Sequence, residues 1–306
     1  MDNSINMTYI TFDGHVEVQK YRYLYFVIMF TVYILIISSN LTIVYIIVIH
    51  KSLHEPMYIF IAALSINSVL FSTAIYPKLL IDFLSEKQII SYSACLLQWY
   101  TYYSLISSDF FLLSAMAYDR YVSICNPLQY PTIMRKRTVC ILLISAWIVP
   151  ASQDTVIIIF SAKKKICNFH LKGILCNSTV HKLHCVRSTI LNIYGLFAFV
   201  IVVILPVLFI VFTYIRILVV SYRCQGVRRK AAQTCLPHLL VLISFSCLTA
   251  YDVLLVRLEL DYYPKTLRLI MALQVIIYQP LFNPIIYGLK MKGINEHLKR
   301  LFCKRV

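Results

Sequence analysis

An aspartate and an arginine stand side by side near the end of a long apolar run at 92–126. A cation at the edge of a membrane is costly and usually functional, and the carboxylate of Asp119 can hold the guanidinium of Arg120 in a resting arrangement. For a lone arginine, the competing explanation is a side chain that snorkels from a helix end. The ordered string around the pair, 116–130 (MAYDRYVSICNPLQY), favours a conformational switch instead.

A second acid lies in the middle of the same run. Asp109 precedes Arg120 by eleven residues, which places it about three helical turns away, in the interior of a membrane. An uncompensated carboxylate is expensive at that depth. We therefore expect Asp109 to be protonated, paired or bound to an ion.

The histidines and cysteines of the chain show no spacing typical of an enzyme's active site. The eight histidines are spread over both sides of the apolar runs, without the spacing of a metal or acid–base set. His181 and His184, with Cys176 and Cys185, are a weak candidate for a metal site, and disulfides in a structured loop are the competing explanation. We expect no catalytic activity.

Four cysteines fall on one side of the predicted membrane. Cys95 begins the third apolar run, and Cys167, Cys176 and Cys185 share the long loop after the fourth. An even set of four suits the oxidising exterior and two disulfides, with three possible connectivities. The glycosylation sequons at Asn6 and Asn177 fall on the same side. Lys and Arg divide almost evenly between the two sides, so these features orient the chain, with its N-terminus outside.

The elements that must position these residues are membrane-spanning helices. The chain has 306 residues, 60% of them hydrophobic and 14% charged, which is far more apolar than a soluble domain. A spanning helix needs about 20 apolar residues. The net charge of +16 is scattered between apolar runs and fits a membrane surface better than a nucleic acid. Seven runs are predicted, at 24–50, 57–83, 92–126, 138–160, 191–222, 229–256 and 264–289.

This pattern divides the chain into three parts. We expect an extracellular tail at 1–23, a seven-helix membrane domain at 24–289, and a cytoplasmic amphipathic helix with a tail at 290–306. The tail holds three acids and no apolar core, so it is not a cleavable signal peptide. Pro206, Pro280 and Pro284 each remove a backbone hydrogen bond and could act as hinges, although prolines also occur in spanning helices that do not move.

The string at 116–130 resembles the hallmark of the odorant receptors, a branch of the rhodopsin-like (class A) G-protein-coupled receptors, with Ser123 where alanine is usual. Further matches follow in order: 53–58 (LHEPMY), 230–239 (KAAQTCLPHL) and 283–287 (NPIIY), with Asn40 and Trp147 as helix markers. The resemblance covers about 24–303. Glu55 and the residues at 59–61 and 245–246 look more like fish than mammalian receptors, which implies water-soluble ligands.

The resemblance implies an all-α bundle at the plasma membrane that binds an odorant, activates a stimulatory olfactory-type G-protein and raises cyclic AMP. It implies disulfides Cys95–Cys176 and Cys167–Cys185. Ligand binding would shift helices six and seven, separate Asp119 from Arg120 and open the inner surface to the G-protein. The residues assigned to coupling and activation are Asp119, Arg120, Tyr121, Tyr214, Asn283, Pro284 and Tyr287.

Family position also predicts a ligand pocket between the outer halves of helices three, five, six and seven. Its expected members are Tyr102, Tyr103, Ile106, Ser107, Ala198, Val202, Ser246, Thr249, Ala250, Tyr251, Val253 and Arg257, although core packing explains any single one as well. Ser246 replaces the usual aromatic and makes the pocket floor smaller and more polar. Arg257, with Lys163, Lys164 and Lys165, could attract anionic odorants; pairing of Arg257 with Glu259 or Asp261 is the alternative.

An acid on helix two commonly helps to bind sodium in related receptors, and that position is Ser68 here. Many odorant receptors carry the acid on helix three instead, where Asp109 stands. We expect a sodium or proton site of Asp109, Asn67 and Ser68, with Asn283 as a further candidate. A protonated aspartate that is hydrogen-bonded within the bundle is the competing explanation.

At the inner face, the basic clusters at 135–137 and 228–230 would contact anionic lipid or the G-protein, and Cys303 is a weak candidate for palmitoylation. Two other classes compete with an odorant receptor. A transporter or channel would need charges along a path through the membrane, and we expect only Asp109 to lie deep. A non-odorant rhodopsin-like receptor is disfavoured by the long cysteine-rich loop and the short inner loop at 223–230.

Overall fold

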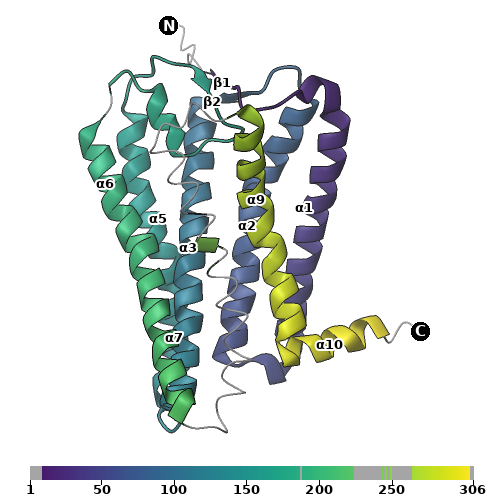
Figure 1. Cartoon of the computed structure of the whole chain (residues 1–306), viewed down its shortest axis with the longest axis vertical. Coiled ribbons are helices and arrows are strands. Elements are labelled where there is room, and N and C mark those ends of the chain that lie inside the picture. Colours follow the sequence, from purple (N-terminus) through teal and green to yellow (C-terminus); the bar gives the residue numbers. More distant parts are fainter. Residues whose placement is uncertain are drawn as a thin grey trace, which may run out of the picture.

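The computed structural model describes residues 9–186, 188–223, 243, 245, 246, 249 and 264–303. Long helices run side by side as a bundle (Figure 1). They are α1 (Val18–Ile49), α2 (Pro56–Leu84), α3 (Tyr92–Cys125), α5 (Lys136–Ala162), the continuous α6 (Thr189–Phe199), η3 (Val200–Ile204) and α7 (Leu205–Arg223), and α9 (Lys265–Lys290).

Five of the described helical segments are long and apolar enough to cross a membrane: α1, α2, α5, the stretch from α6 into α7, and α9. The 34-residue α3 is more polar, since it carries Asp109, Asp119 and Arg120, and it packs against α2, α5 and α7 in the middle of the bundle. Most of the run expected at 229–256 lies outside the described residues, but Ile243, Phe245, Ser246 and Thr249 have helical backbone.

Short elements close the two ends of the bundle. The end predicted to be cytoplasmic, called the inner end, carries η1 (Lys51–Leu53), α4 (Tyr130–Ile133) and α10 (Lys292–Cys303), which runs across the bundle axis; the opposite end is called the outer end (Figure 1). Helix α10 packs on the end of α1, where the rings of His50 and His297 lie 3.8 Å apart, and it buries Ile294 completely. The amphipathic helix expected after the seventh span is therefore present.

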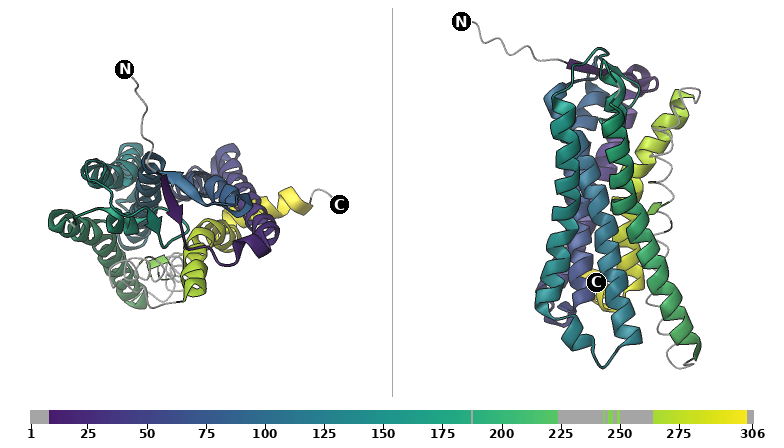
Figure 2. Two further views of the ribbon diagram at one scale, coloured as in Figure 1. Left: turned by 90° about the horizontal axis from the view of Figure 1, so that it is seen from above. Right: turned by 90° about the vertical axis from the view of Figure 1, so that its left-hand side faces the viewer.

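The outer end carries a three-stranded sheet that the sequence did not predict. Strand β1 (Tyr9–Phe12) lies between β2 (Ile89–Ser91), with which it is antiparallel, and β3 (His170–Leu171), with which it is parallel. Seen from above, β1 crosses the ends of the helices (Figure 2). Its side chains Ile10 and Phe12 are 0% and 3% exposed. Residues 9–12 of the expected tail are thus part of the folded outer cap.

The continuous helix of α6, η3 and α7, which is the fifth predicted span, contains a π-turn, η3, that ends two residues before Pro206. Proline has no backbone N–H, so the carbonyl four residues earlier loses its helical partner, and a π-turn is a common way to accommodate such a break. Pro280 and Pro284 lie inside α9, whose helix continues through both. The predicted break is therefore visible in the helix geometry at Pro206.

Candidate ligand cavity and switch

A cavity of about 360 Å³ opens toward the outer end of the bundle. Its volume falls within the range of small-molecule sites. Its wall comes from α3, α5, α6, η3, the loop helix η2 (Ser178–Leu183) and the segment after it, and Thr249. The wall residues are Trp99, Tyr103, Ile106, Ser107, Gln153, Asp154, Ile157, Ser178, His181, Lys182, His184, Ser188, Leu191, Asn192, Gly195, Ala198, Phe199, Val202, Val203 and Thr249.

Six of the predicted pocket residues line this cavity: Tyr103, Ile106, Ser107, Ala198, Val202 and Thr249. Tyr102 instead packs in the core, 2% exposed, with its ring 5.7 Å from that of Phe71. Ser246 is half-buried and is not a wall residue. Ala250, Tyr251, Val253 and Arg257 lie outside the described residues, as do Glu259 and Asp261. Lys163, Lys164 and Lys165 are not in the wall, whereas Lys182 is.

Helix α5, the fourth predicted span, forms part of the wall and was missing from the predicted pocket. It contributes Asp154, whose Oδ2 accepts a hydrogen bond of 2.9 Å from Ser104 Oγ. The expectation that only Asp109 lies deep among the acids is therefore wrong. The signal was present as an acid inside the fourth apolar run, but hydropathy alone does not tell whether such a residue faces lipid, core or cavity.

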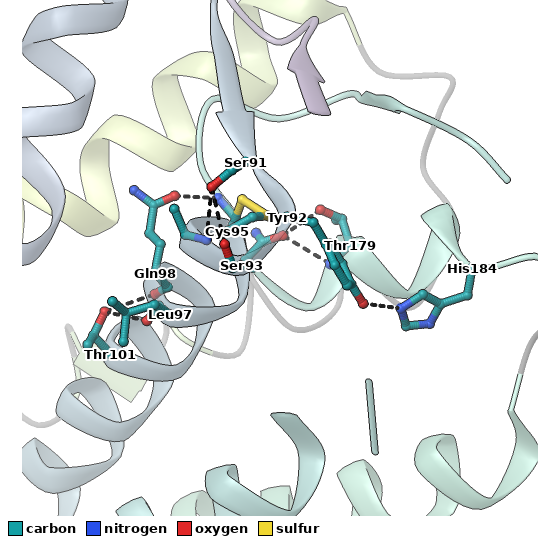
Figure 3. Close-up of a disulfide and its surroundings, with 12 residues drawn as sticks. Ser91, Tyr92, Ser93, Cys95, Leu97, Gln98, Thr101, Thr179 and His184 are labelled. Atoms are coloured by element: carbon teal, nitrogen blue, oxygen red, sulfur yellow. Dashed lines mark hydrogen bonds between the residues drawn. A yellow bond between two sulfur atoms is a disulfide. The ribbon is translucent and has the colours of Figure 1, made fainter. Parts of the chain in front are cut away.

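Two disulfides hold the long outer loop over the cavity, with the pairing that the resemblance implied: Cys95–Cys176 and Cys167–Cys185. The Cys95–Cys176 bond attaches the loop to the start of α3, where Gln98 Oε1 also accepts from the Cys176 amide at 2.9 Å (Figure 3). Because Cys176 and Cys185 are disulfide-bonded, they cannot serve as the thiolates of the weak metal candidate with His181 and His184.

Aromatic residues of α3 bind the same loop. The Tyr103 hydroxyl lies 3.0 Å from Ser178 Oγ, and the Tyr92 hydroxyl lies 3.2 Å from Nε2 of His184 (Figure 3). Burial, and then the charge of Lys164, lowers the pKa of His184. A lowered pKa favours the neutral imidazole near pH 7, so His184 presents a polar but uncharged ring to the cavity.

Asp109 lies below the cavity in a buried polar cluster and is 4% exposed. Its Oδ1 accepts from Nδ2 of Asn67 at 2.8 Å, and its Oδ2 accepts from Nε2 of Gln279 on α9. Trp147 Nε1 donates to Asn67 Oδ1 at 3.0 Å. The cluster therefore connects α2, α3, α5 and α9. Gln279 is a member that sequence reasoning missed.

The predicted sodium ligands are divided in this structure. Asp109 and Asn67 are joined by a hydrogen bond, whereas the Ser68 hydroxyl donates to the Leu64 carbonyl of its own helix at 3.1 Å. Asn283 is 2% exposed. Carboxylate and hydroxyl oxygens suit Na⁺, but amide N–H groups already contact both carboxylate oxygens. Because an ionised carboxylate can accept about four hydrogen bonds, a sodium ion would either share these oxygens with the two amides or displace one of them.

Asn40 supplies a hydrogen bond that α9 loses because of Pro284, a proline within the seventh-helix motif. Pro284 has no N–H to donate to the carbonyl of Pro280, one turn earlier. Asn40 Nδ2 donates to that carbonyl at 2.8 Å and also to Ile36 at 2.9 Å. The family marker on α1 therefore satisfies a buried backbone acceptor on α9.

At the inner end of α3, Arg120 is paired with Asp119, whose carboxylate is completely buried. Tyr130 of α4 donates to Asp119 Oδ1 at 2.8 Å. Burial, and then the charge of Asp119, raises the pKa of Tyr130, so its hydroxyl remains a donor. Tyr214 on α7 and Tyr287 on α9 are also buried, at 6% and 1% exposed. Tyr121 is half-buried. Asp119 and Arg120 are thus ion-paired, and the pair is closed by the hydroxyl of Tyr130.

The helical bundle has the fold of a rhodopsin. The crystal structure of squid rhodopsin matches with a TM-score of 0.77 at 19% sequence identity, covering 94% of this chain and 87% of that one. This likeness establishes the seven-helix fold.

Sequence relatives narrow the class further. A family model described as "Olfactory receptor" matches residues 29–305. Human olfactory receptor 6K3 is 34% identical over 98% of this chain and 91% of its own length. Human olfactory receptor 11A1 is 31% identical over 95% of this chain and 92% of its own length. The chain belongs to the olfactory receptor family.

Proposed function

We propose that this receptor binds a small odorant in the cavity bounded by α3, α5, α6, η3 and η2, and activates a stimulatory olfactory-type G-protein that raises cyclic AMP. The observation that carries the proposal is that one helix joins the two sites. Ile106 and Ser107 line the cavity, and Arg120 lies at the inner end of the same α3, about 20 Å away at about 1.5 Å per residue.

The mechanism is a shift between two packings of the bundle. A ligand moves that equilibrium only if it binds one packing more tightly than the other. The π-turn η3 contributes Val202 and Val203 to the cavity wall. A ligand there therefore directly contacts the irregular segment between α6 and α7. Repacking at this segment is expected to move α7 against α3, release Arg120 from Asp119, and let Arg120 approach Tyr214 and Tyr287.

Filling the cavity is expected to abolish the ligand response. In cells that express the olfactory stimulatory G-protein, the wild-type receptor should raise cyclic AMP when a screen of water-soluble acids, amino acids, amines and alcohols is applied. Val202→Trp should lower that response at least about tenfold, because a bulky ring overpacks the site, and should leave surface expression unchanged. Cyclic AMP accumulation and surface labelling are measured together.

The matched control is Leu208→Trp on α7, which adds the same ring at a side chain that is 58% exposed on the outside of the bundle. This variant should respond like the wild type. Equal responses of Val202→Trp and the wild type would contradict the assignment of the cavity. An ion current without G-protein would favour a channel.

We also propose that the β1 end of the bundle faces the exterior at the plasma membrane. Both disulfides lie at that end, where oxidising conditions preserve them. The sequon residue Asn177 uses its Oδ1 to accept hydrogen bonds from the Thr179 amide and hydroxyl, at 3.0 and 2.6 Å. Its Nδ2, the atom that carries an N-linked glycan, is not used in either bond. Asn6 lies outside the described residues.

Asp109 is proposed as the site of a regulatory sodium ion or proton. Asp109→Leu should be more destabilising than Asp109→Asn, because it leaves the amides of Asn67 and Gln279 without an acceptor, at about 1–3 kcal/mol for each buried donor. The melting temperature of the purified receptor, measured with NaCl or with choline chloride, tests both parts. If sodium acts here, it should stabilise the wild type more than Asp109→Asn.

Glu86→Gln removes an exposed acid at the outer end and serves as the control for net charge. It should keep the full sodium effect. A sodium effect of the same size in wild type and Asp109→Asn, with basal activity insensitive to both sodium and pH, would exclude the ion.

A further inference from the structure

We propose that the cavity recognises the protonated amino group of its ligand, with Asp154 as the counter-ion and Gln153 as a second acceptor. The inference rests on the proposed function, since it assigns a ligand class to the same cavity. The proposed ligand is a cation, whereas the basic residues Arg257 and Lys163 to Lys165 had suggested an anion.

Asp154 is a carboxylate in the cavity wall, and none of the cations that the structure describes is paired with it. Its described hydrogen bond is the one that Oδ2 accepts from the hydroxyl of Ser104, and no Lys, Arg or His in the described part of the chain lies within ion-pair distance of it. A hydroxyl offers one donor, whereas an ionised carboxylate can accept about four hydrogen bonds. Asp154 therefore has acceptor capacity left for a ligand.

Gln153, the preceding residue on α5, supplies a further acceptor. Its side-chain Oε1 is buried and has no hydrogen-bond partner among the residues that the structure describes, and Gln153 also lines the cavity. A buried acceptor that stays unpaired costs free energy. An alkylammonium group carries three N–H donors, which matches in number the acceptors that Asp154, Gln153 and the hydroxyl of Ser107 place in this wall.

The rest of the wall suits the body of an amine. Ile106, Leu191, Val202 and Val203 offer apolar surface, and Trp99, Tyr103 and Phe199 offer aromatic rings that stabilise a nearby cation. A primary amine has a pKa close to that of lysine, about 10.4, and is therefore charged at pH 7. Such a ligand brings the positive charge that the wall lacks at Asp154.

The cations of the cavity lie toward its mouth. Lys182, on η2 of the outer loop, is the one Lys or Arg among the described wall residues, and the pKa of His184 is lowered, which favours its neutral form. Asp154 lies eight residues before the end of α5, about 12 Å deeper along that helix. The positive charge of Lys182 thus lies nearer the mouth than the carboxylate of Asp154. This arrangement orients an amine with its nitrogen at Asp154 and its apolar body against the apolar part of the wall.

The test measures binding to the purified receptor in lipid nanodiscs at pH 7, without G-protein, by thermal shift and by titration. The probes are hexylamine, hexanol and hexanoate, which differ in the head group only. The wild type should bind hexylamine most tightly. Asp154→Asn should weaken hexylamine binding about 10- to 100-fold, in line with the loss of a charge-assisted contact, and change hexanol binding little.

Asp154→Glu keeps the charge and should retain the preference for the amine, and Glu86→Gln, an exposed outer acid, should behave like the wild type. The comparison of the three probes on the wild type holds even if a variant fails to fold. Preference for hexanol or hexanoate, or an undiminished amine preference in Asp154→Asn, would overturn the inference. If amine binding needs Asp154, but the same amine raises no cyclic AMP in cells that express the receptor and the olfactory stimulatory G-protein, the proposed function alone would be overturned.

Discussion

Arg120→Ala is expected to abolish signalling while ligand binding and surface expression persist. Arg120 is bound to the buried carboxylate of Asp119 at the inner end of α3, far from the cavity wall. Removing the guanidinium therefore leaves the ligand contacts intact and deletes the group expected to move when the bundle opens. Coupling between two sites is typically worth about 1–3 kcal/mol, so its loss should remove a ligand-induced rise of about 5- to 150-fold and leave cyclic AMP at the basal level.

Arg300→Ala is the matched control, because it removes an exposed inner arginine that lies on α10 and outside the Asp119–Arg120 pair. It should signal normally. Ligand binding to Arg120→Ala is followed by thermal shift, and coupling by cyclic AMP accumulation. Preserved cyclic AMP production in Arg120→Ala would remove Arg120 from the coupling machinery.

Cys95→Ser is expected to have the largest effect on stability. The bond to Cys176 links residues separated by 81 positions, and both cysteines are 0% exposed. Closing a loop of that length stabilises a fold by about 4–5 kcal/mol in the chain-entropy description, compared with about 3 kcal/mol for the bond between Cys167 and Cys185, whose separation is 18. Loss of the longer link also frees the loop that covers the cavity.

The measurement is the melting temperature of the purified receptor, together with the fraction that reaches the cell surface. Both should fall more in Cys95→Ser than in Cys167→Ser. Cys140→Ser removes an exposed free thiol and should change neither quantity. Equal stability of Cys95→Ser and Cys140→Ser would show that the bond to Cys176 contributes little to the fold.

The sequence predicted the helices and the pairing of Asp119 with Arg120 well because their signals are local. Apolar runs locate helices directly, and the Asp119–Arg120 pair lies within one ordered string. Asn40 was identified only as a family marker, and its hydrogen bond to the Pro280 carbonyl depends on how α1 packs against α9. Contacts between helices are set by packing geometry, which periodicity within one helix does not reveal.

The cavity was predicted less completely for the same reason. Asp154 and Gln279 both lie in apolar helices, where hydropathy cannot separate residues facing a cavity, the core or lipid. The contact of Gln279 with Asp109 joins positions 170 residues apart. Strand β1 was missed because four residues pair with two loops distant in sequence, and so short a segment has no periodicity of its own.

Activation of a G-protein at the inner face by a ligand in the outer cavity can be measured with purified components. The receptor is reconstituted in lipid nanodiscs with a stimulatory heterotrimeric G-protein, and nucleotide exchange is followed as an odorant is titrated. Exchange should rise with ligand in the wild type and in Leu208→Trp, and should stay at its basal rate in Val202→Trp and Arg120→Ala. Exchange that rises equally in all four proteins, or an odorant that binds the cavity of the wild type without any rise, would contradict this mechanism of activation.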